Sequence, residues 1–264
     1  MKKENCPISK RVAGAILHKK WGQYELSDKL IVQRIVDSLE LTKDDTVLEI
    51  GSGTGILTLP IRDRGVKIIA VEIDGRFAGL LQAMGVEVIN GDFLKVNLKD
   101  LPPITKIVSN LPYYITTPII TKILEEKMPF QSMFLTMQKE VAKRLLAEPR
   151  TKDYGAISVL VKYYTEPEFV LDVPRRSFHP VPDVDSTLVR FRKKEQPKID
   201  FPEEFLFKVV RIGFGTRRKM LKNNLKMFKN LDNIKVDLTR RAETLSVSEF
   251  CELAYDLWKG RQES

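Results

Sequence analysis

The chain has 264 residues, 43% of them hydrophobic, which is enough to bury a sizeable core in one or two domains. It has no run of about 18 apolar residues, so no transmembrane helix is expected, and no apolar segment follows the N-terminal lysines, so no secretory signal is expected. The net charge of +9 favours a polyanionic partner such as nucleic acid. Cys6 and Cys251 are too few for a disulfide framework or a metal cluster, so we expect reduced thiols and no metal.

In chain order, the first predicted element is a helix over Ser27–Leu39, with Ser27 or Asp28 as its cap. From residue 46 onward, short apolar runs alternate with helical stretches, which is typical of a parallel sheet covered by helices on both faces. The predicted strands are Thr46–Ile50, Lys67–Ile73, Val86–Ile89, Lys106–Ser109 and Ser132–Met137, and the helices between them include Arg76–Met84 and Pro118–Glu126.

Two later apolar runs complete the predicted sheet. Glu168–Leu171 and Ser186–Arg192 are separated by too few residues for a usual helical crossover, so we expect antiparallel neighbours. The predicted fold class is therefore α/β, with a Rossmann-like, mostly parallel seven-stranded sheet that has an antiparallel edge strand.

The composition changes after the last predicted strand. A charged segment punctuated by Pro197 and Pro202 precedes a region with helical periodicity, so we predict a catalytic domain over 1–195 and a small all-helical domain over 196–264. Residues 205–230 contain eight lysines and arginines and no acid. Helical spacing of the apolar residues would leave these cations on one face. A solvated helix face is the alternative, but such faces usually mix both signs, so we expect a nucleic-acid surface.

A glycine-rich turn is the strongest local motif of the predicted sheet. VLEIGSGTGILT, residues 47–58, joins an apolar strand to a helix through Gly51, Gly53 and Gly55, which permit a tight turn and close approach of a ligand. Dinucleotide enzymes usually have G-x-G-x-x-G/A, whereas Ile56 occupies the last position of that pattern here. The spacing argues against NAD or FAD and favours S-adenosylmethionine.

Acidic residues end the next two predicted strands. Glu72 lies about 20 residues beyond the glycines, where a carboxylate can accept hydrogen bonds from both ribose hydroxyls. Asp92 ends the third strand, within reach of an adenine ring. Either acid alone could be a solvated loop residue or a helix cap. Together with the glycines they form an ordered row at the carboxyl ends of the strands, where such sheets bind ligands.

The fourth strand leads into Asn110-Leu111-Pro112-Tyr113. The amine of adenine is a poor nucleophile because its lone pair is delocalised into the ring. Two acceptors aimed at its hydrogens favour the tetrahedral geometry that attack on a sulfonium methyl group requires. The side-chain oxygen of Asn110 and the carbonyl of Leu111 can serve as these two acceptors. Pro112 would stiffen the turn, and Tyr113 would stack on the flipped base. We therefore predict methylation of adenine in nucleic acid.

These motifs and several others make the chain similar to the ribosomal-RNA adenine dimethyltransferases, and within them to the bacterial small-subunit type. The resemblance covers about residues 19–258, through EIGSGTG (49–55), VEID (71–74), GDF (91–93), NLPYYI (110–115), MQKEVAKRL (137–145), YGAISV (154–159), FHPVPDVDSTLVRF (178–191) and FGTRRKMLKNNL (214–225). The strand-end motifs are shared by amine methyltransferases, whereas MQKEVAKRL, FHPVPDVDS and RRKMLKNNL are far more specific.

The resemblance implies dimethylation of two adjacent adenosines near the 3′ end of small-subunit ribosomal RNA, in the assembling 30S particle, by a cytoplasmic monomer. It implies that Phe178 stacks on the flipped adenine opposite Tyr113. Implied cofactor contacts are Tyr24, Leu26, Gly51, Glu72, Asp92 and Asn110, beside Gly53 and Gly55 of the glycine-rich turn. The basic segment is expected to contact RNA through Arg217, Arg218, Lys219 and Lys222.

The chain departs from the family pattern at two places. The family usually has Gly-Gln, then Asn or His, then Phe-Leu, where this chain has Gly22–Leu26 with the sequence GQYEL, so the charge of Glu25 is unexpected. Asp183 stands where lysine is usual, which would remove a phosphate contact. His179 is expected to be a surface residue, because no step of this chemistry needs a histidine.

Two other functions remain open from the sequence. A large-subunit methyltransferase of the macrolide-resistance type would use the same chemistry on another RNA. A non-enzymatic RNA-binding assembly factor could keep the scaffold, although the intact glycines, Glu72, Asp92 and Asn110 argue against lost catalysis.

Overall fold

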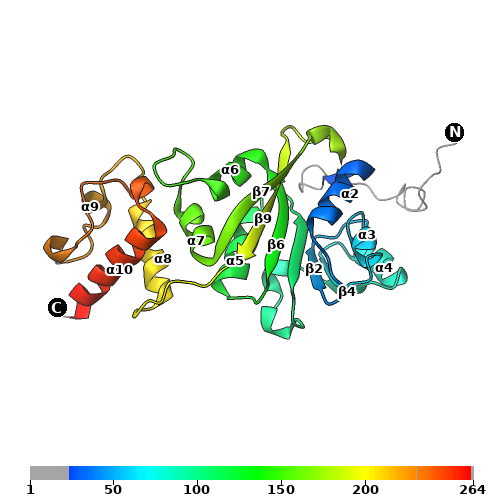
Figure 1. The fold of residues 1–264 in the computed structure, drawn as a ribbon, viewed down its shortest axis with the longest axis horizontal. Coiled ribbons are helices and arrows are strands. Elements are labelled where there is room, and N and C mark those ends of the chain that lie inside the picture. Colours follow the sequence, from blue (N-terminus) through cyan, green and yellow to red (C-terminus); the bar gives the residue numbers. More distant parts are fainter. Residues whose placement is uncertain (1–23, 230, 263–264) are drawn as a thin grey trace. The chain divides into compact units, whose positions relative to one another are not determined.

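A computed structural model describes residues 24–229 and 231–262. Cys6, His18 and the Gly22-Gln23 pair lie outside the described residues. The chain forms two compact units, one of Met1–Ala142 with Glu168–Arg192, the other of Lys143–Pro167 with Lys193–Ser264 (Figure 1). The second unit thus includes residues 143–167 in addition to the C-terminal region. These units are defined by packing, so the functional boundary between 195 and 196 stays a prediction.

A seven-stranded sheet with the order β4-β3-β2-β5-β6-β9-β7 forms the centre of the first unit. Its strands are β2 (Thr46–Ile50), β3 (Lys67–Glu72), β4 (Glu87–Asn90), β5 (Lys106–Asn110), β6 (Ser132–Gln138), β7 (Thr165–Val173) and β9 (Ser186–Lys193). The pairs from β4 to β6 are parallel, whereas β9 runs antiparallel to β6. The predicted fold class is confirmed, with one correction: the antiparallel strand β9 lies one position inside the edge, because β7 takes the outermost place.

Helices pack against both faces of the central strands, which is why these strands lack a polar face. Helix α2 (Lys29–Ser38) begins at Asp28, whose carboxylate accepts from the amides of Leu30 and Ile31, so Asp28 and not Ser27 is the cap. It shares one core with α3 (Thr58–Arg62) and α4 (Gly75–Ala83). Helix α5 (Thr116–Glu125) buries a separate apolar face, and α6 (Lys139–Leu146) follows β6.

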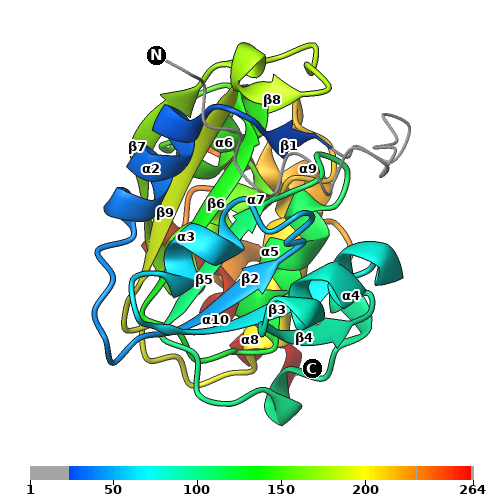
Figure 2. The same cartoon turned by 90° about the vertical axis from the view of Figure 1, so that its right-hand side faces the viewer.

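A two-stranded ladder joins the start of the described chain to the segment before β9 (Figure 2). Strand β1 (Glu25–Leu26) pairs antiparallel with β8 (Phe178–His179), with Glu25 opposite His179 and Leu26 opposite Phe178. The ladder brings together two segments that the sequence gives no reason to pair.

The second unit is helical in its described C-terminal part, as predicted. It contains α7 (Ala156–Tyr164), α8 (Glu203–Gly213), α9 (Leu221–Asn224), α10 (Val247–Gln262) and two 3-10 turns, η5 (Leu231–Asn233) and η6 (Ala242–Thr244). Its core is aromatic: Phe250 of α10 stacks on Phe214, and Phe205 packs edge-on against Trp258. No helix of the described residues has the length and apolar character needed to cross a membrane.

The basic segment is not one amphipathic helix, which corrects the expectation for residues 205–230. Helix α8 ends at Gly213, and turns occupy residues 214–220 before α9 begins. The side chain of Asn224 closes this end, since its Nδ2 donates to the carbonyl oxygens of Gly213 at 2.6 Å and Thr216 at 3.2 Å. The helical spacing of the apolar residues therefore reflects two short helices and the loop between them.

Candidate active site

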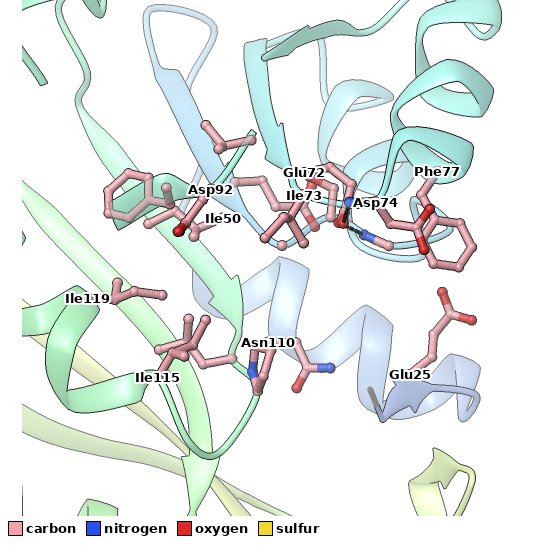
Figure 3. A pocket seen from close by; sticks show the side chains of 18 of the residues that line it. Glu25, Ile50, Glu72, Ile73, Asp74, Phe77, Asp92, Asn110, Ile115 and Ile119 are labelled. Atoms are coloured by element: carbon pink, nitrogen blue, oxygen red, sulfur yellow. Dashed lines mark hydrogen bonds between the residues drawn. The ribbon is translucent and has the colours of Figure 1, made fainter. Parts of the chain in front are cut away.

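A cavity of about 810 Å³ opens at the carboxyl ends of β2, β3, β4 and β5 (Figure 3). Eight predicted site residues line it: Tyr24, Gly51, Gly53, Glu72, Asp92, Asn110, Leu111 and Pro112. Four other residues predicted to be catalytic or to bind the cofactor lie outside the lining: Leu26, Gly55, Tyr113 and Phe178. Its size is ordinary for a pocket that holds a small molecule. The strand-end motifs therefore meet in one place, as the predicted parallel sheet requires.

Glu72 faces the cavity and also holds the glycine-rich turn of residues 51–55, which we call the glycine loop. One carboxylate oxygen accepts from the amide of Gly53 and the other from the amide of Asp74, both at 2.8 Å. Burial raises the pKa of Glu72, and these two amides partly offset the effect. Each oxygen keeps a second lone pair, so the carboxylate can still accept hydrogen bonds from two hydroxyl groups of a ligand.

Three further carboxyl groups in the cavity, those of Glu25, Glu49 and Asp74, were not predicted as site residues. Glu49 lies at the end of β2, fully buried, with one oxygen that lacks a hydrogen-bond partner among the described residues. Burial raises its pKa to about 8. Glu25 projects from β1 and accepts from the Thr54 amide at 3.0 Å. Glu49 could have been identified from its place in the strand before the glycines, whereas Glu25 reaches the loop only through the β1–β8 ladder.

The lining is strongly acidic. Its carboxyl groups are those of Glu25, Glu49, Glu72, Asp74 and Asp92, and no lysine, arginine or histidine is present among the described residues that line it. Such a pocket attracts a ligand with net positive charge and disfavours a pyrophosphate. The electrostatics thus agree with the glycine spacing in arguing against a dinucleotide.

Apolar side chains supply the remaining walls and were missed by sequence reasoning. Ile73 follows Glu72 directly and is 67% exposed, a large value for an isoleucine at a strand end. Leu94, Phe77 and Tyr114 also line the cavity. Exposed apolar groups in a concave site offer a flat ring something to pack on. The position of Ile73 directly after the strand-end acid was the available signal.

Asn110 ends β5 with its side-chain orientation defined by a distant segment. Its Nδ2 donates to the backbone carbonyl of Tyr24 at 2.9 Å, across 86 residues of sequence. Because the amide nitrogen is engaged, the side-chain oxygen is left as an acceptor, on a residue that lines the cavity. An incoming amino group, which donates hydrogen bonds, requires such an acceptor.

The rings of the two aromatic residues predicted to stack on a flipped base pack against other side chains of the protein. Tyr113 stacks against Tyr24, with ring centroids 5.2 Å apart and an interplanar angle of 28°, and its hydroxyl lies 3.1 Å from that of Ser186. Phe178 is 2% exposed and packs in the core with Leu26. A base that stacks on both predicted rings must first uncover them, so this role of Phe178 and Tyr113 stays a prediction.

Gly55 has a packing role that the sequence pattern does not reveal. Its φ is +87°, and a Cβ there would lie 2.7 Å from Cδ2 of Leu81 in α4. Gly55 thus lets α4 approach the loop, and its contact with a cofactor stays a prediction.

Gly55→Ala should lower the free energy of unfolding by more than the roughly 1–3 kcal/mol of positive-φ strain alone, because the Leu81 contact adds to that strain. Gly65→Ala is the matched control, since Gly65 has a φ of +78° and no atom within 4 Å of an added Cβ. Urea unfolding of both variants measures the difference. Equal losses of unfolding free energy in the two variants would show that the Leu81 contact does not add to the destabilisation.

The cations predicted to bind RNA lie in the second unit, at and after the turns of residues 214–220; we call Arg217, Arg218, Lys219 and Lys222 the basic loop. All four are exposed. Arg217 is partly engaged: it donates to the carbonyl oxygens of Lys152 and Tyr154 and lies 3.7 Å from a Glu243 oxygen. No ion pair within the described residues involves the other three.

His179 and Asp183, in the segment before β9, are both exposed. His179 presents its side chain at the surface, as expected. The backbone carbonyl of Asp183 accepts from Arg175 at 3.2 Å, so the side chain of Asp183 takes no part in that contact.

Comparison with known proteins agrees with this geometry. The family model described as ribosomal RNA adenine dimethylase matches residues 15–257. Proteins named ribosomal RNA small subunit methyltransferase A, from Bacillus thuringiensis (strain Al Hakam) and Bacillus cytotoxicus, are 41% identical to the chain over 91% of both lengths.

Solved structures are also similar. A dimethyladenosine transferase from Plasmodium falciparum has a TM-score of 0.77 and 26% identity, over 90% of this chain and 98% of its own. The 23S rRNA methyltransferase ErmE has a TM-score of 0.66 and 30% identity, over 88% and 99%. With a family match across nearly the whole chain, the strand order of a methyltransferase and the strand-end residues gathered in one cavity, the chain belongs to the ribosomal RNA adenine dimethylase family.

Proposed function

We propose that this enzyme uses S-adenosylmethionine to dimethylate the exocyclic amine of two adjacent adenosines near the 3′ end of 16S ribosomal RNA, during assembly of the 30S particle in the cytoplasm. The observation that carries the proposal is the hydrogen bond from Asn110 Nδ2 to the Tyr24 carbonyl, which leaves the side-chain oxygen as the acceptor on a residue that lines an acidic cavity with Glu72 and Asp92. The names of the 41% identical relatives support the small subunit as the target.

The residues of the cavity fit S-adenosylmethionine. This molecule supplies an electrophilic methyl carbon on a sulfonium and carries net positive charge, which suits a lining with five carboxyl groups and no basic side chain among the described residues. Glu72 would accept from the ribose hydroxyls, Asp92 would reach the adenine amine, and Ile73 would pack on the adenine ring. Gly51 and Gly53 would let the amino-acid part approach the backbone.

The reaction then depends on how the protein presents the target amine. The Asn110 side-chain oxygen would accept one hydrogen of the amine and the Leu111 carbonyl the other, so that the nitrogen lone pair is directed toward the methyl carbon. S-adenosylmethionine would supply the methyl group, its carbon–sulfur bond breaking as the bond to nitrogen forms, and the proton lost from the nitrogen would pass to water. The mechanism needs no metal, and no group of at least three possible metal ligands occurs in the described part of the chain.

Mass spectrometry of small-subunit ribosomal RNA after incubation with enzyme and cofactor tests the function. The proposal expects two adjacent nucleotides, each heavier by two methyl groups. A large-subunit target is the second candidate, because ErmE is 30% identical over most of both chains. Supplying purified 16S and 23S RNA, free and in immature particles, separates the two. Label found only on 23S RNA would overturn the small-subunit assignment.

The basic loop should bind RNA phosphates and position the substrate. Replacing Arg218, Lys219 and Lys222 with glutamine should weaken RNA binding and flatten its salt dependence by roughly one unit of slope for each phosphate that is no longer neutralised. Arg217 is left in place because its bonds to Lys152 and Tyr154 make it part of the fold.

The matched control neutralises the exposed lysines Lys29, Lys43 and Lys99 of the first unit. Binding measured over a range of salt concentrations should show the change only in the basic-loop variant, with cofactor affinity unaltered in both. An unchanged slope in the basic-loop variant would place the RNA elsewhere.

A further inference from the structure

The carboxylate of Glu25 is held on the wall of the cavity by the glycine loop. Its Oε1 accepts from both the backbone amide and the hydroxyl of Thr54, and an added Cβ on Gly53 would lie 3.4 Å from the same oxygen. The pairing of β1 with β8 holds the backbone of Glu25 opposite His179. Glu25 is therefore anchored at the backbone and at one oxygen.

The second oxygen of Glu25 makes no hydrogen bond or ion pair with the described residues. The side chain is only partly buried and lines the cavity, so this oxygen is available to a ligand. Burial raises the pKa of Glu25, with a further contribution from the charge of Glu72. A cation of the ligand would supply the partner that the second oxygen of Glu25 lacks and would favour its charged form.

We propose that Glu25 is a specificity-determining residue of the cofactor pocket, whose carboxylate pairs with the α-ammonium group of S-adenosylmethionine and selects ligands that carry this cation. The inference rests on the proposed function, because it takes S-adenosylmethionine as the ligand. It gives a role to the one charged residue of the cavity that the family pattern does not contain.

The order of the strands identifies the ammonium end as the partner. With adenine at Asp92 after β4, ribose at Glu72 after β3 and the methyl group directed to Asn110 after β5, the amino-acid end falls over the loop after β2. That loop is where Glu25 is bonded to Thr54. The sulfonium, by contrast, must lie toward Asn110.

Calorimetric titration of three ligands tests the pairing. S-adenosylmethionine carries both cations, S-adenosylhomocysteine keeps the ammonium without the sulfonium charge, and 5′-methylthioadenosine lacks the amino-acid end. Glu25→Gln keeps an acceptor for Thr54 but removes the charge. Affinity for the first two ligands should fall about tenfold, as expected for a lost charge-assisted hydrogen bond. Affinity for 5′-methylthioadenosine should change by less than about twofold.

Glu87→Gln is the matched control, because Glu87 begins β4 in an exposed ion pair with Lys67 outside the cavity lining. It should change none of the three affinities. Equal weakening of all three ligands in Glu25→Gln would show a structural effect and overturn the inference. Unchanged binding of S-adenosylmethionine and S-adenosylhomocysteine in Glu25→Gln would also overturn the inference. Tighter binding of these two ligands would overturn it as well, and would show that Glu25 repels their carboxylate group. If the wild-type protein bound neither S-adenosylmethionine nor S-adenosylhomocysteine, the proposed function itself would fall.

Discussion

Replacing Asn110 with alanine is expected to slow methyl transfer about a hundredfold while RNA and cofactor still bind. The side-chain oxygen is the acceptor that orients the target amine, and loss of one pre-organised polar group of this kind typically costs about 3 kcal/mol in the transition state. The variant also removes the hydrogen bond from Asn110 Nδ2 to the Tyr24 carbonyl. Single-turnover rates at saturating cofactor measure the chemical step.

Asn90→Ala controls for the removal of that side-chain-to-backbone hydrogen bond. Asn90 ends β4, donates from its Nδ2 to the Glu72 carbonyl at 2.8 Å and does not line the cavity. It should therefore keep nearly normal chemistry. Wild-type single-turnover rates in Asn110→Ala would overturn the assignment of the catalytic motif.

The same Asn110 variant should accumulate monomethyl-adenosine. After the first transfer one hydrogen remains on the nitrogen, and it must be held by either the Asn110 oxygen or the Leu111 carbonyl. We expect the Asn110 side chain to follow the altered amine more readily than a carbonyl next to Pro112, so its loss should slow the second step more. Assays that resolve mono- and dimethyl-adenosine decide between the two acceptors, and a product that is dimethylated throughout would point to Leu111.

Glu72→Ala is expected to weaken cofactor binding by about ten- to a hundredfold, which corresponds to roughly 1.5–3 kcal/mol for hydrogen bonds to a charged group. Two losses combine: the acceptors for the ribose hydroxyls, and the bonds that hold the amides of Gly53 and Asp74. Calorimetry with S-adenosylhomocysteine measures the affinity.

Glu72→Gln separates these two losses. It keeps an acceptor for one of the amides and should bind with intermediate affinity if the loop geometry contributes. Urea unfolding of both variants shows whether the fold is kept. An unchanged affinity in a folded Glu72→Ala protein would remove Glu72 from the binding site.

The sequence alone predicted the seven strands of the sheet and the motifs at their carboxyl ends. Alternation of apolar runs with helical stretches predicted the sheet, since parallel strands are buried on both faces and their connections are helical. The predicted boundaries differ by a few residues at most, as for the helix Arg76–Met84, which is α4 (Gly75–Ala83). Because strand ends of a parallel sheet share one edge, the order of the motifs along the chain was sufficient to assign Glu72, Asp92 and Asn110 to one pocket.

The tertiary structure decided whatever depends on segments distant in sequence. The Tyr24 carbonyl orients Asn110, the Tyr24 ring covers Tyr113, and Glu25 reaches Thr54, all through a two-residue strand whose partner lies about 150 residues away. So short a strand has no periodicity to read, and its pairing is set by packing of the whole unit. Phe178 is buried for the same reason, since it lies in the strand that pairs with β1 and packs with Leu26. The local sequence gives the chemical groups that are present, whereas only the folded chain determines which of them lie next to one another.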